Sequence, residues 1–380
     1  MPTNSAAVLA VRSGDLEVRP MPLPSPGPGQ LVVRNQFIAV NPLDVVKQTT
    51  GNLMYGWLPY PAVLGEDVAG EVVEVGPGVT RFRPGDRVIA YALGMEKGRD
   101  HNAEGGFQLC TVVDEHLAAP VPDAVPLEDA VVLPLAISTA ASALFQQDQL
   151  ALRYPTVPDG AAVPAPSGTG EWVVVWGGST SVGSNAIQLA AAAGYRVLVT
   201  ASPHNHPRMR ALGADAVVDY KSPDAVEGII AGLRGGPVAG ILAIGTGSAD
   251  PCITIAARTG VKRVALASPA VPLQGLPRTG GFNLRRAMAV AELVLRTGRM
   301  MTRAKLLRIR AKFVWGASLR GNAVGPMLWV DFLPAALRAG TYTLAPVAEV
   351  VGEGLDGVQK ALDLLSEGVS ARKLVIRLHG

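Results

Sequence analysis

The chain has 380 residues, of which 48% are hydrophobic, and a formal net charge of +3 at pH 7. This length exceeds one ordinary core, so we expect two domains, or one domain split by an insertion. No apolar run reaches the roughly 18 to 20 residues of a membrane span. The Lys and Arg residues form no continuous basic stripe. We therefore expect a soluble protein that binds neither membrane nor nucleic acid.

The cysteines point to a reducing compartment. Cys110 and Cys252 stand far apart and form no Cys-x-x-Cys pair, which disfavours a cysteine-based zinc module or a disulfide framework. The first residues, from Met1 to Val8, show no basic segment followed by an apolar core, so a secretory signal is not expected. We predict a cytoplasmic location.

Short strand-like runs broken by Pro, Gly and Asn fill the chain from Ser5 to about Leu144. This pattern is typical of a mostly β domain. The expected strands are Ala6–Val11, Leu31–Val40, Val68–Val75, Arg87–Tyr91 and Phe107–Val113. A further β-like run, Lys373–Leu378, closes the chain, and we expect the segment from Ala311 onward to fold back onto this first domain.

A segment rich in Pro, Ala, Gly and Ser, between Gln146 and Gly170, has the composition of an exposed connection. After it, continuous apolar strands alternate with amphipathic helices, as in a parallel sheet covered on both faces. The five expected strands are Trp172–Trp176, Arg196–Thr200, Ala216–Asp219, Ile241–Ile244 and Val261–Leu266. The expected helices lie near Val182–Ala193, Arg208–Leu212, Ala225–Leu233, Pro251–Arg258 and Arg285–Thr297. The predicted fold is α/β, with residues 146–310 as a doubly wound nucleotide-binding (Rossmann) domain and residues 1–145 and 311–380 as the other domain.

The first of these strands runs directly into a turn of small residues that opens a helix. The residues of this turn are Gly177, Gly178, Ser179, Thr180, Ser181, Val182 and Gly183. Glycines here permit a tight turn and the close approach of a pyrophosphate to backbone N–H groups. Thr180 stands where the middle glycine of a dinucleotide fingerprint would be, so a generic strand-to-helix turn is the alternative.

The end of the second strand indicates which dinucleotide binds. NAD-binding chains usually carry Asp or Glu there, to hold the ribose hydroxyls. This chain has Ser202-Pro203-His204-Asn205 instead. Neutral donors and the nearby Lys221 can accept the 2′-phosphate of NADP, whereas a carboxylate would repel it. We expect NADPH, with Ser202, Asn205 and Tyr220 in its site; Ser202-Pro203 equally suits a helix N-terminus.

Four blocks resemble the medium-chain dehydrogenase/reductase superfamily. They are Asn41-Pro42-Leu43-Asp44-Val45-Val46-Lys47, Leu64-Gly65-Glu66-Asp67-Val68-Ala69-Gly70 through Gly76, Gly85-Asp86-Arg87-Val88, and Gly105-Gly106-Phe107-Gln108. The resemblance implies a GroES-like catalytic domain beside the Rossmann domain. Within the superfamily, the turn after Trp176, the Ser-Pro-His-Asn sequence and the block from Leu212 to Tyr220 look like the fungal trans-acting enoyl reductases. That likeness implies an acyl-carrier-tethered polyketide substrate and a highly reducing polyketide synthase as partner.

Many members of this superfamily bind zinc through Cys, His and sometimes Glu. At the matching Gly-His-Glu position this chain has Gly65-Glu66-Asp67, and no cysteine stands near Asn41. Two adjacent carboxylates without imidazole are a weak metal site. We therefore expect a zinc-independent protein, with no metal site and with solvent or strand-end roles for Glu66 and Asp67.

The resemblance also supplies catalytic candidates for a reaction that delivers hydride to the β-carbon of an enoyl thioester and then a proton to the α-carbon. Lys47 resembles the family's active-site lysine and could bind the developing oxyanion or supply the proton; a surface lysine is the alternative. Thr139 lies where the family places a small residue near the nicotinamide, although a helix-start or packing role is equally open. Tyr55 could line the acyl pocket or donate a proton.

One departure keeps other functions open. Where relatives often have an Asp-Cys pair, the fourth strand ends Ala243-Ile244-Gly245-Thr246-Gly247. A non-redox cyclase, an isomerase or a non-catalytic synthase partner on the same fold is therefore an alternative. A reductase of free enones or quinones is another, because the same fold and cofactor support both reactions. A basic run could dock an acidic carrier protein, or could simply be a solvated face. Its members are Arg303, Lys305, Arg308, Arg310 and Lys312.

Overall fold

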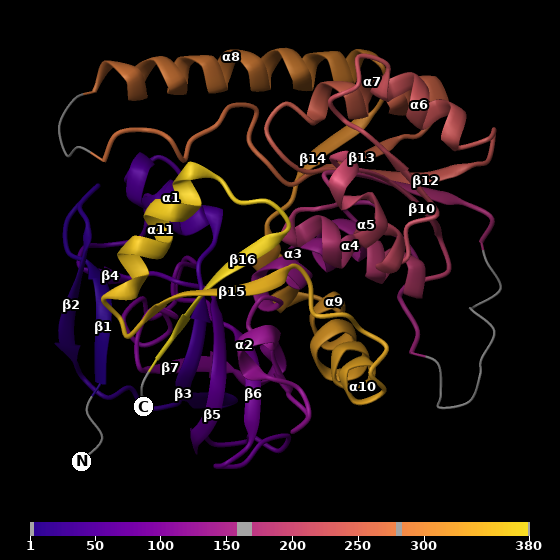
Figure 1. Ribbon diagram of the computed structural model, residues 1–380. Coiled ribbons are helices and arrows are strands. Elements are labelled where there is room, and N and C mark those ends of the chain that lie inside the picture. The colour runs from indigo at the N-terminus through magenta and orange to yellow at the C-terminus, as the bar shows by residue number, and fades with distance from the viewer. Residues whose placement is uncertain (1–3, 158–168, 279–282, 379–380) are drawn as a thin grey trace.

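The computed structural model describes residues 4–157, 169–278 and 283–378. Its two large sheets form two halves, with the mostly antiparallel one at the lower left of Figure 1 and the parallel one at the upper right. The predicted connection from Gln146 to Gly170 lies partly outside the described residues. The fold is α/β, with a Rossmann half and a GroES-like half.

The GroES-like half has a seven-stranded sheet in the order β15-β16-β3-β5-β6-β8, with β7 paired to β3, and a three-stranded sheet in the order β2-β1-β4. Its strands are β1 (Asn4–Leu9), β2 (Leu16–Met21), β3 (Gln30–Ala39), β4 (Ala62–Val63), β5 (Asp67–Val75), β6 (Arg87–Tyr91), β7 (Cys110–Asp114), β8 (Ala118–Pro120), β15 (Val347–Glu353) and β16 (Arg372–Arg377). Its helices are α1 (Pro42–Thr50), η1 (Glu115–Leu117), α2 (Leu127–Ala130) and α11 (Gly357–Glu367). The C-terminal strand therefore returns to the first sheet, because β16 pairs antiparallel with β3.

The Rossmann half has a six-stranded parallel sheet in the order β11-β10-β9-β12-β13-β14. Its strands are β9 (Trp172–Trp176), β10 (Arg196–Thr200), β11 (Ala216–Val218), β12 (Val238–Ala243), β13 (Arg263–Leu266) and β14 (Arg310–Phe313). The helices that accompany it are α3 (Pro134–Phe145), α4 (Ser181–Ala192), η2 (Pro203–Asn205), α5 (His206–Ala211), α6 (Ala225–Gly232), α7 (Ala249–Thr259) and α8 (Leu284–Leu306). The segment after β14 contains η3 (Gly316–Gly321), α9 (Val324–Pro326), η4 (Met327–Phe332) and α10 (Leu333–Arg338).

Strand β9 shows why a continuous apolar run becomes a central strand. Val173 and Val175 pack into the core on the α3 and α4 side, whereas Trp172 and Val174 pack into the core on the α6 and α7 side. Successive side chains of a strand point to opposite faces, so a strand covered on both faces is apolar throughout. Strands β9 and β10 have the predicted bounds.

The parallel sheet extends beyond the predicted limit at residue 310. Strand β14 pairs with β13 and carries the sheet to Phe313, so the sheet has six strands and not the expected five. Only Ala311 of this edge strand is buried, and its basic and apolar residues gave no apolar run to recognise. Helix α8 is also longer than predicted and ends at Leu306.

Within the described residues, one helical stretch, Leu127–Phe145, is apolar and long enough to cross a membrane by length and composition. Most of it is buried inside the protein, where α3 packs against α4. Its hydrophobicity is therefore that of a core helix.

Candidate active site

The residues predicted to bind the cofactor meet at one edge of the parallel sheet. The glycine turn follows β9, Ser202 follows β10 and Tyr220 follows β11, and these three strands are parallel neighbours. Carboxyl ends of parallel strands form the crevice in which doubly wound sheets bind nucleotides. The structure thus brings these residues together, as their spacing indicates.

The turn after β9 requires glycine at two positions. Gly177 has φ +93°, and a Cβ there would lie 2.7 Å from the carbonyl oxygen of Ile244. A Cβ on Gly183 would lie 2.2 Å from the carbonyl oxygen of Gly177, which no side chain can occupy. The first glycine makes the turn and the second allows helix α4 to pack against it.

Thr180, which interrupts the glycine fingerprint, caps helix α4. Its hydroxyl donates to the Gly177 carbonyl oxygen (2.8 Å) and accepts from the Gly183 N–H (3.0 Å). Among the described contacts, the N–H groups of Ser181 and Val182 make no internal hydrogen bond. A helix N-terminus with free N–H groups is an anion site, and these residues therefore fit a dinucleotide pyrophosphate.

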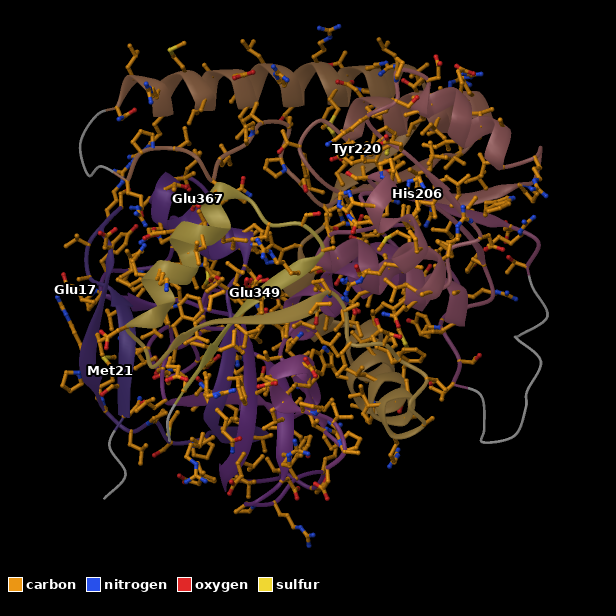
Figure 2. The ribbon with its side chains drawn as sticks, in the orientation of Figure 1. Glu17, Met21, His206, Tyr220, Glu349 and Glu367 are labelled. Carbon is orange, nitrogen blue, oxygen red and sulfur yellow. The ribbon has the colours of Figure 1, made fainter. Side chains whose placement is uncertain are left out.

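The residues after β10 and β11 lie beside this turn. Asn205 is buried, and its side-chain amide is 3.5 Å from the Ser370 hydroxyl. Tyr220 is 42% exposed, and Figure 2 shows it on the same half as His206 of α5. Lys221 is exposed and lies 5.9 Å from the Tyr220 ring centroid. Hydroxyl, amide and ammonium groups are thus available at the end of β10 and β11.

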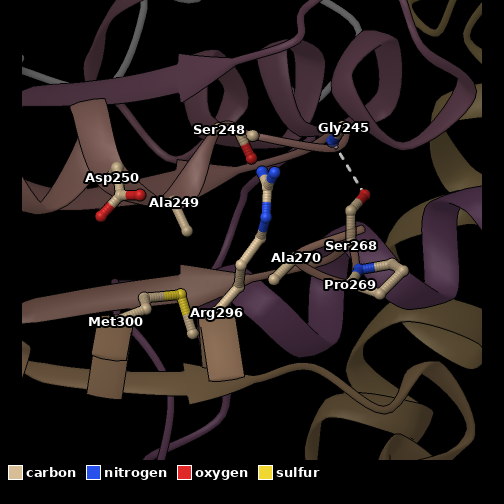
Figure 3. A pocket seen from close by; sticks show the side chains of 10 residues that line it. Gly245, Ser248, Ala249, Asp250, Ser268, Pro269, Ala270, Arg296 and Met300 are labelled. Atoms are coloured by element: carbon tan, nitrogen blue, oxygen red, sulfur yellow. Dashed lines mark hydrogen bonds between the residues drawn. The ribbon is translucent and has the colours of Figure 1, made fainter. Parts of the chain in front are cut away.

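A pocket opens at the carboxyl ends of β12 and β13, next to the strand end that departs from the family pattern. Gly245 and Ser268 line it, and the Gly245 N–H donates to the Ser268 hydroxyl at 2.8 Å. Figure 3 shows the Arg296 guanidinium reaching from α8 toward Ser248 at the start of α7. A Cβ on Gly245 or Gly247 would meet no atom within 4 Å, so these two glycines leave open space at this edge of the sheet.

Helix α1 carries the first catalytic candidate of the GroES-like half. Asp44 accepts hydrogen bonds from the N–H groups of Asn41 (2.8 Å) and Gly65 (3.1 Å). Burial raises the pKa of Asp44 to about 7 despite these bonds, and the Asp67 carboxylate contributes to the rise. Asp44 thereby joins the start of α1 to the loop before β5.

Lys47 is fully buried, which excludes its alternative reading as a surface lysine. Its Nζ lies 3.1 Å from the Tyr55 carbonyl oxygen, 3.4 Å from Asn52 Oδ1 and 4.6 Å from the Tyr60 ring centroid. Burial, together with the charge of Arg12, lowers the pKa of Lys47 to about 8. Its ammonium group therefore holds the loop that contains Tyr55.

The two adjacent carboxylates before β5 are buried, so the expected solvent role is wrong, whereas their place at a strand start is confirmed. Asp67 Oδ2 lies 2.5 Å from Lys373 Nζ and accepts from the Asn41 side chain (2.6 Å), and Oδ1 accepts from the Leu135 N–H (2.6 Å). Asp67 thus joins β5, β16, α1 and α3 in one buried ion-pair network.

Glu66 lies beside a group of buried aromatic residues. The Tyr91 hydroxyl donates to Glu66 Oε1 at 3.4 Å, whereas Oε2 has no partner among the described residues. Burial raises the pKa of Glu66 well above its usual range, and the charges of Asp44, Glu96 and Asp67 add to the rise. Burial therefore favours the neutral, protonated form of the Glu66 carboxyl group.

Tyr55 is buried, and its hydroxyl likewise has no hydrogen-bond partner in the described part of the chain. Its ring lies 5.5 Å from Trp57 and 5.6 Å from Trp315, centroid to centroid. The Trp315 indole N–H donates to the Glu96 carboxylate at 2.9 Å. A buried polar atom left unpaired costs about 1–3 kcal/mol, so two of them in one cluster require an explanation.

Thr139 of α3 is partly exposed, and its hydroxyl donates to the Leu135 carbonyl oxygen at 2.8 Å. The Gly316 backbone lies against it, since a Cβ there would be 2.5 Å from Thr139 Oγ1 and 3.3 Å from the Tyr91 hydroxyl. Thr139 is therefore next to Tyr91, which contacts Glu66. The two catalytic candidates, Lys47 and Thr139, have no direct contact among the described ones. They are linked through successive contacts of Tyr55, Trp315 and Gly316.

Sequence reasoning missed Tyr91, Glu96 and Lys373 as members of this cluster. Each belongs to an unremarkable segment, and only the fold places them together.

Two members of the predicted basic run have acidic partners. Lys312 pairs with Asp148, and Arg303 lies 3.4 Å from Asp250. Within the described residues, no group of three or more His, Cys, Asp and Glu side chains has the arrangement of a metal site.

Comparisons with known proteins agree with this architecture. Residues 27–123 match the family model of the alcohol dehydrogenase GroES-like domain. The chain is 44% identical to "Dehydrogenase pigH" of Monascus ruber over 100% of both chains. It is 37% identical to "Trans-enoyl reductase himH" of Aspergillus japonicus, covering 97% of this chain and 95% of the relative. The crystal structure of CurK enoyl reductase has the same fold, with a TM-score of 0.70 at 15% identity and 100% coverage of both chains.

The two-sheet fold and the nucleotide turn define a two-domain oxidoreductase of the alcohol dehydrogenase type. The chain belongs to the medium-chain dehydrogenase/reductase superfamily and resembles its trans-acting enoyl reductases.

Proposed function

We propose that this protein is an NADPH-dependent, zinc-independent enoyl reductase that acts in trans on acyl-carrier-tethered intermediates of a highly reducing polyketide synthase. One observation carries the proposal. The edge of the parallel sheet offers free N–H groups at α4 and neutral donors after β10, in a chain 37% identical over 97% of its length to a trans-enoyl reductase.

NADPH, when bound, supplies a hydride with its electron pair. Ser181 and Val182 would bind the pyrophosphate through their N–H groups, and Ser202, Asn205, Tyr220 and Lys221 would lie toward the 2′-phosphate. No carboxylate occurs from Thr200 to Asn205, so the end of β10 has nothing to repel that phosphate. These contacts favour NADPH over NADH.

The GroES-like half would bind the thioester. Thr139 would border the nicotinamide, and Lys47 would hold Tyr55 through its carbonyl oxygen. The β-carbon takes the hydride, the electron pair of the C=C bond moves to the α-carbon and the carbonyl oxygen, and the α-carbon takes a proton from water. The product is the saturated thioester.

The test follows the NADPH absorbance band with a short enoyl pantetheine thioester, a free enone and a quinone as separate substrates. We expect oxidation of NADPH to be fastest with the thioester. No oxidation with the thioester, or a preference for the quinone, would reject the proposal.

Lys47→Ala should lower kcat by about 100-fold while the Kd for NADPH stays within a few-fold, because Lys47 contacts the Tyr55 loop and not the cofactor turn. Lys360→Ala, which removes an exposed lysine of α11, is the matched control. A Lys47→Ala enzyme with parental kcat would remove Lys47 from the proposed mechanism.

A further inference from the structure

The hydroxyl of Tyr55 and Oε2 of Glu66 are buried polar atoms without a hydrogen-bond partner in the described structure. Tyr55 is 1% exposed and Glu66 is 2% exposed. Native proteins pair the large majority of such atoms, and an exception usually has a functional reason. Two exceptions in one cluster indicate a ligand that satisfies both.

Both groups have a proton to donate when they are neutral. A neutral carboxylic acid has one O–H donor, and Glu66 Oε1 already accepts from the Tyr91 hydroxyl. The proton of Glu66 therefore belongs on the free atom, Oε2. Tyr55 also stays protonated, because burial and the nearby Glu66 raise its pKa well above the usual range. A hydrogen-bond acceptor placed between the two groups can therefore satisfy both.

We propose that the Tyr55 hydroxyl and the protonated Glu66 carboxyl together bind the carbonyl oxygen of the enoyl thioester and stabilise the negative charge that develops on it. The inference rests on the proposed enoyl reduction and assigns two catalytic residues to it. A tyrosine paired with a neutral carboxylic acid is an effective oxyanion site, because both donors are fixed in an apolar environment before the charge forms.

The location agrees with this role. The Tyr91 hydroxyl donates to Glu66, and the Gly316 backbone lies beside both that hydroxyl and Thr139, the candidate neighbour of the nicotinamide. In this arrangement Lys47 is a positioning residue, since its ammonium group donates to the Tyr55 carbonyl oxygen. During the step Tyr55 and Glu66 keep their protons: the carbonyl oxygen gains charge as hydride reaches the β-carbon, and loses it when water protonates the α-carbon.

Access to the two donors requires movement of the aromatic residues around them. Trp57 is 37% exposed, and its ring lies 5.5 Å from Tyr55 and 6.3 Å from Trp315. Trp57 therefore lies between the cluster and solvent. In the proposed complex the acyl chain displaces its ring.

The first test is Tyr55→Phe, measured with NADPH and an enoyl pantetheine thioester. We expect kcat to fall about 100-fold, which is the effect of removing one oxyanion donor, with the Kd for NADPH unchanged. The melting temperature should stay the same or rise, because the lost hydroxyl has no partner in the free protein. A purely structural role would lower the melting temperature and spare kcat.

The second test is Glu66→Gln, whose side-chain amide can still donate a weaker hydrogen bond. We expect kcat to fall about 10-fold. The parental rate should also decline at high pH as Glu66 ionises, and E66Q should lack this decline. The groups that face Glu66 are Asp44, Asp67, Glu96, Lys373, Tyr55 and Tyr91, so the comparison with E66Q isolates its own titration.

Tyr342→Phe is the matched control. The Tyr342 hydroxyl is also buried, but it donates to Asn185 at 2.7 Å. Its removal should lower the melting temperature while kcat stays within threefold of the parent. If the parent is active and the kcat values of Tyr55→Phe and Glu66→Gln both stay within threefold of the parental kcat, this inference is overturned and the proposed function stays intact. A parent that oxidises no NADPH with the thioester would overturn both.

Discussion

The cofactor turn and the buried acid cluster differ in how they are built from the chain. The cluster consists of Asp44, Glu66, Asp67, Glu96, Lys373, Tyr55, Tyr91 and Trp315. The turn from Gly177 to Gly183 is continuous in sequence and works through backbone groups and one hydroxyl, that of Thr180. The cluster is assembled from α1, the loop before β5, the end of β6, the segment at Trp315 and strand β16. Its members are long side chains from distant parts of the chain.

The difference lies in how each region handles charge. In the described part of the chain, the turn leaves the N–H groups of Ser181 and Val182 without an internal partner at a helix N-terminus, where an anion can satisfy them. The cluster removes carboxyl groups from water and either pairs them, as Lys373 pairs with Asp67, or raises their pKa through burial, as for Glu66. Changes in the cluster should therefore affect stability and pH response, whereas changes in the turn should affect cofactor affinity.

The largest expected effect is that of Lys373→Met. This change leaves the Asp67 carboxylate buried without its cation, and removal of one partner of a buried ion pair costs about 3–5 kcal/mol. Urea denaturation should show this loss in the free energy of unfolding. Combining it with Asp67→Asn should recover part of the loss. A single variant that loses less than about 1 kcal/mol would mean that the pair behaves like a surface salt bridge.

Gly183→Ala should have the next largest effect and should act on the turn. Its Cβ would meet the Gly177 carbonyl oxygen at 2.2 Å, which forces the turn and α4 apart. We expect the Kd for NADPH, measured by fluorescence titration, to rise at least about 100-fold, equivalent to about 2.7 kcal/mol. Binding within threefold of the parent would show that the turn tolerates displacement and would weaken the contrast with the cluster.

The sequence predicted the turn well because its determinants are local. Strand β9, the small residues after it and Thr180 at the helix start follow one another within a dozen positions, and each has a strong conformational preference. The same locality explains why the longer apolar strands of both halves were recognised, whereas β2, β4, β8, β15 and the edge strand β14 were missed. The single buried residue of β14, Ala311, leaves no pattern to detect.

The cluster could not be predicted in the same way. The ion pair of Asp67 and Lys373 joins residues at opposite ends of the chain, and the contact of Gly316 with Thr139 depends on how η3 packs on α3. The resemblance identified Lys47 and Thr139 as candidates but gave no reason to group Glu66 with Tyr55. For the two carboxylates the expected strand-end position is confirmed, whereas the solvent alternative was wrong because their burial depends on tertiary packing alone.

A pH-dependent prediction concerns Asp44. Its folded pKa of about 7 lies above the 3.8 of an unperturbed aspartate, so the folded protein holds the proton more tightly than the unfolded chain. Its contribution to stability is full below about pH 4 and is lost as the pH rises through 7. Asp44→Asn should reduce the decline in unfolding free energy between pH 5 and 7, which for one proton is at most about 1.4 kcal/mol per pH unit. An unchanged slope would assign the decline to other groups.

The smallest effect is expected from Gly298→Ala, which places the same added methyl group where nothing opposes it. Gly298 lies in the middle of α8, is exposed, and has no atom within 4 Å of the position of a Cβ. Alanine is favoured over glycine within a helix by about 1 kcal/mol, so the melting temperature should rise slightly and the Kd for NADPH should not change. Gly298→Ala and Gly183→Ala thus form a matched pair of glycine-to-alanine substitutions. The first should leave the Kd for NADPH unchanged, and the second should raise it. A loss of stability here would show that the outer face of α8 has a constraint that its open surroundings do not reveal.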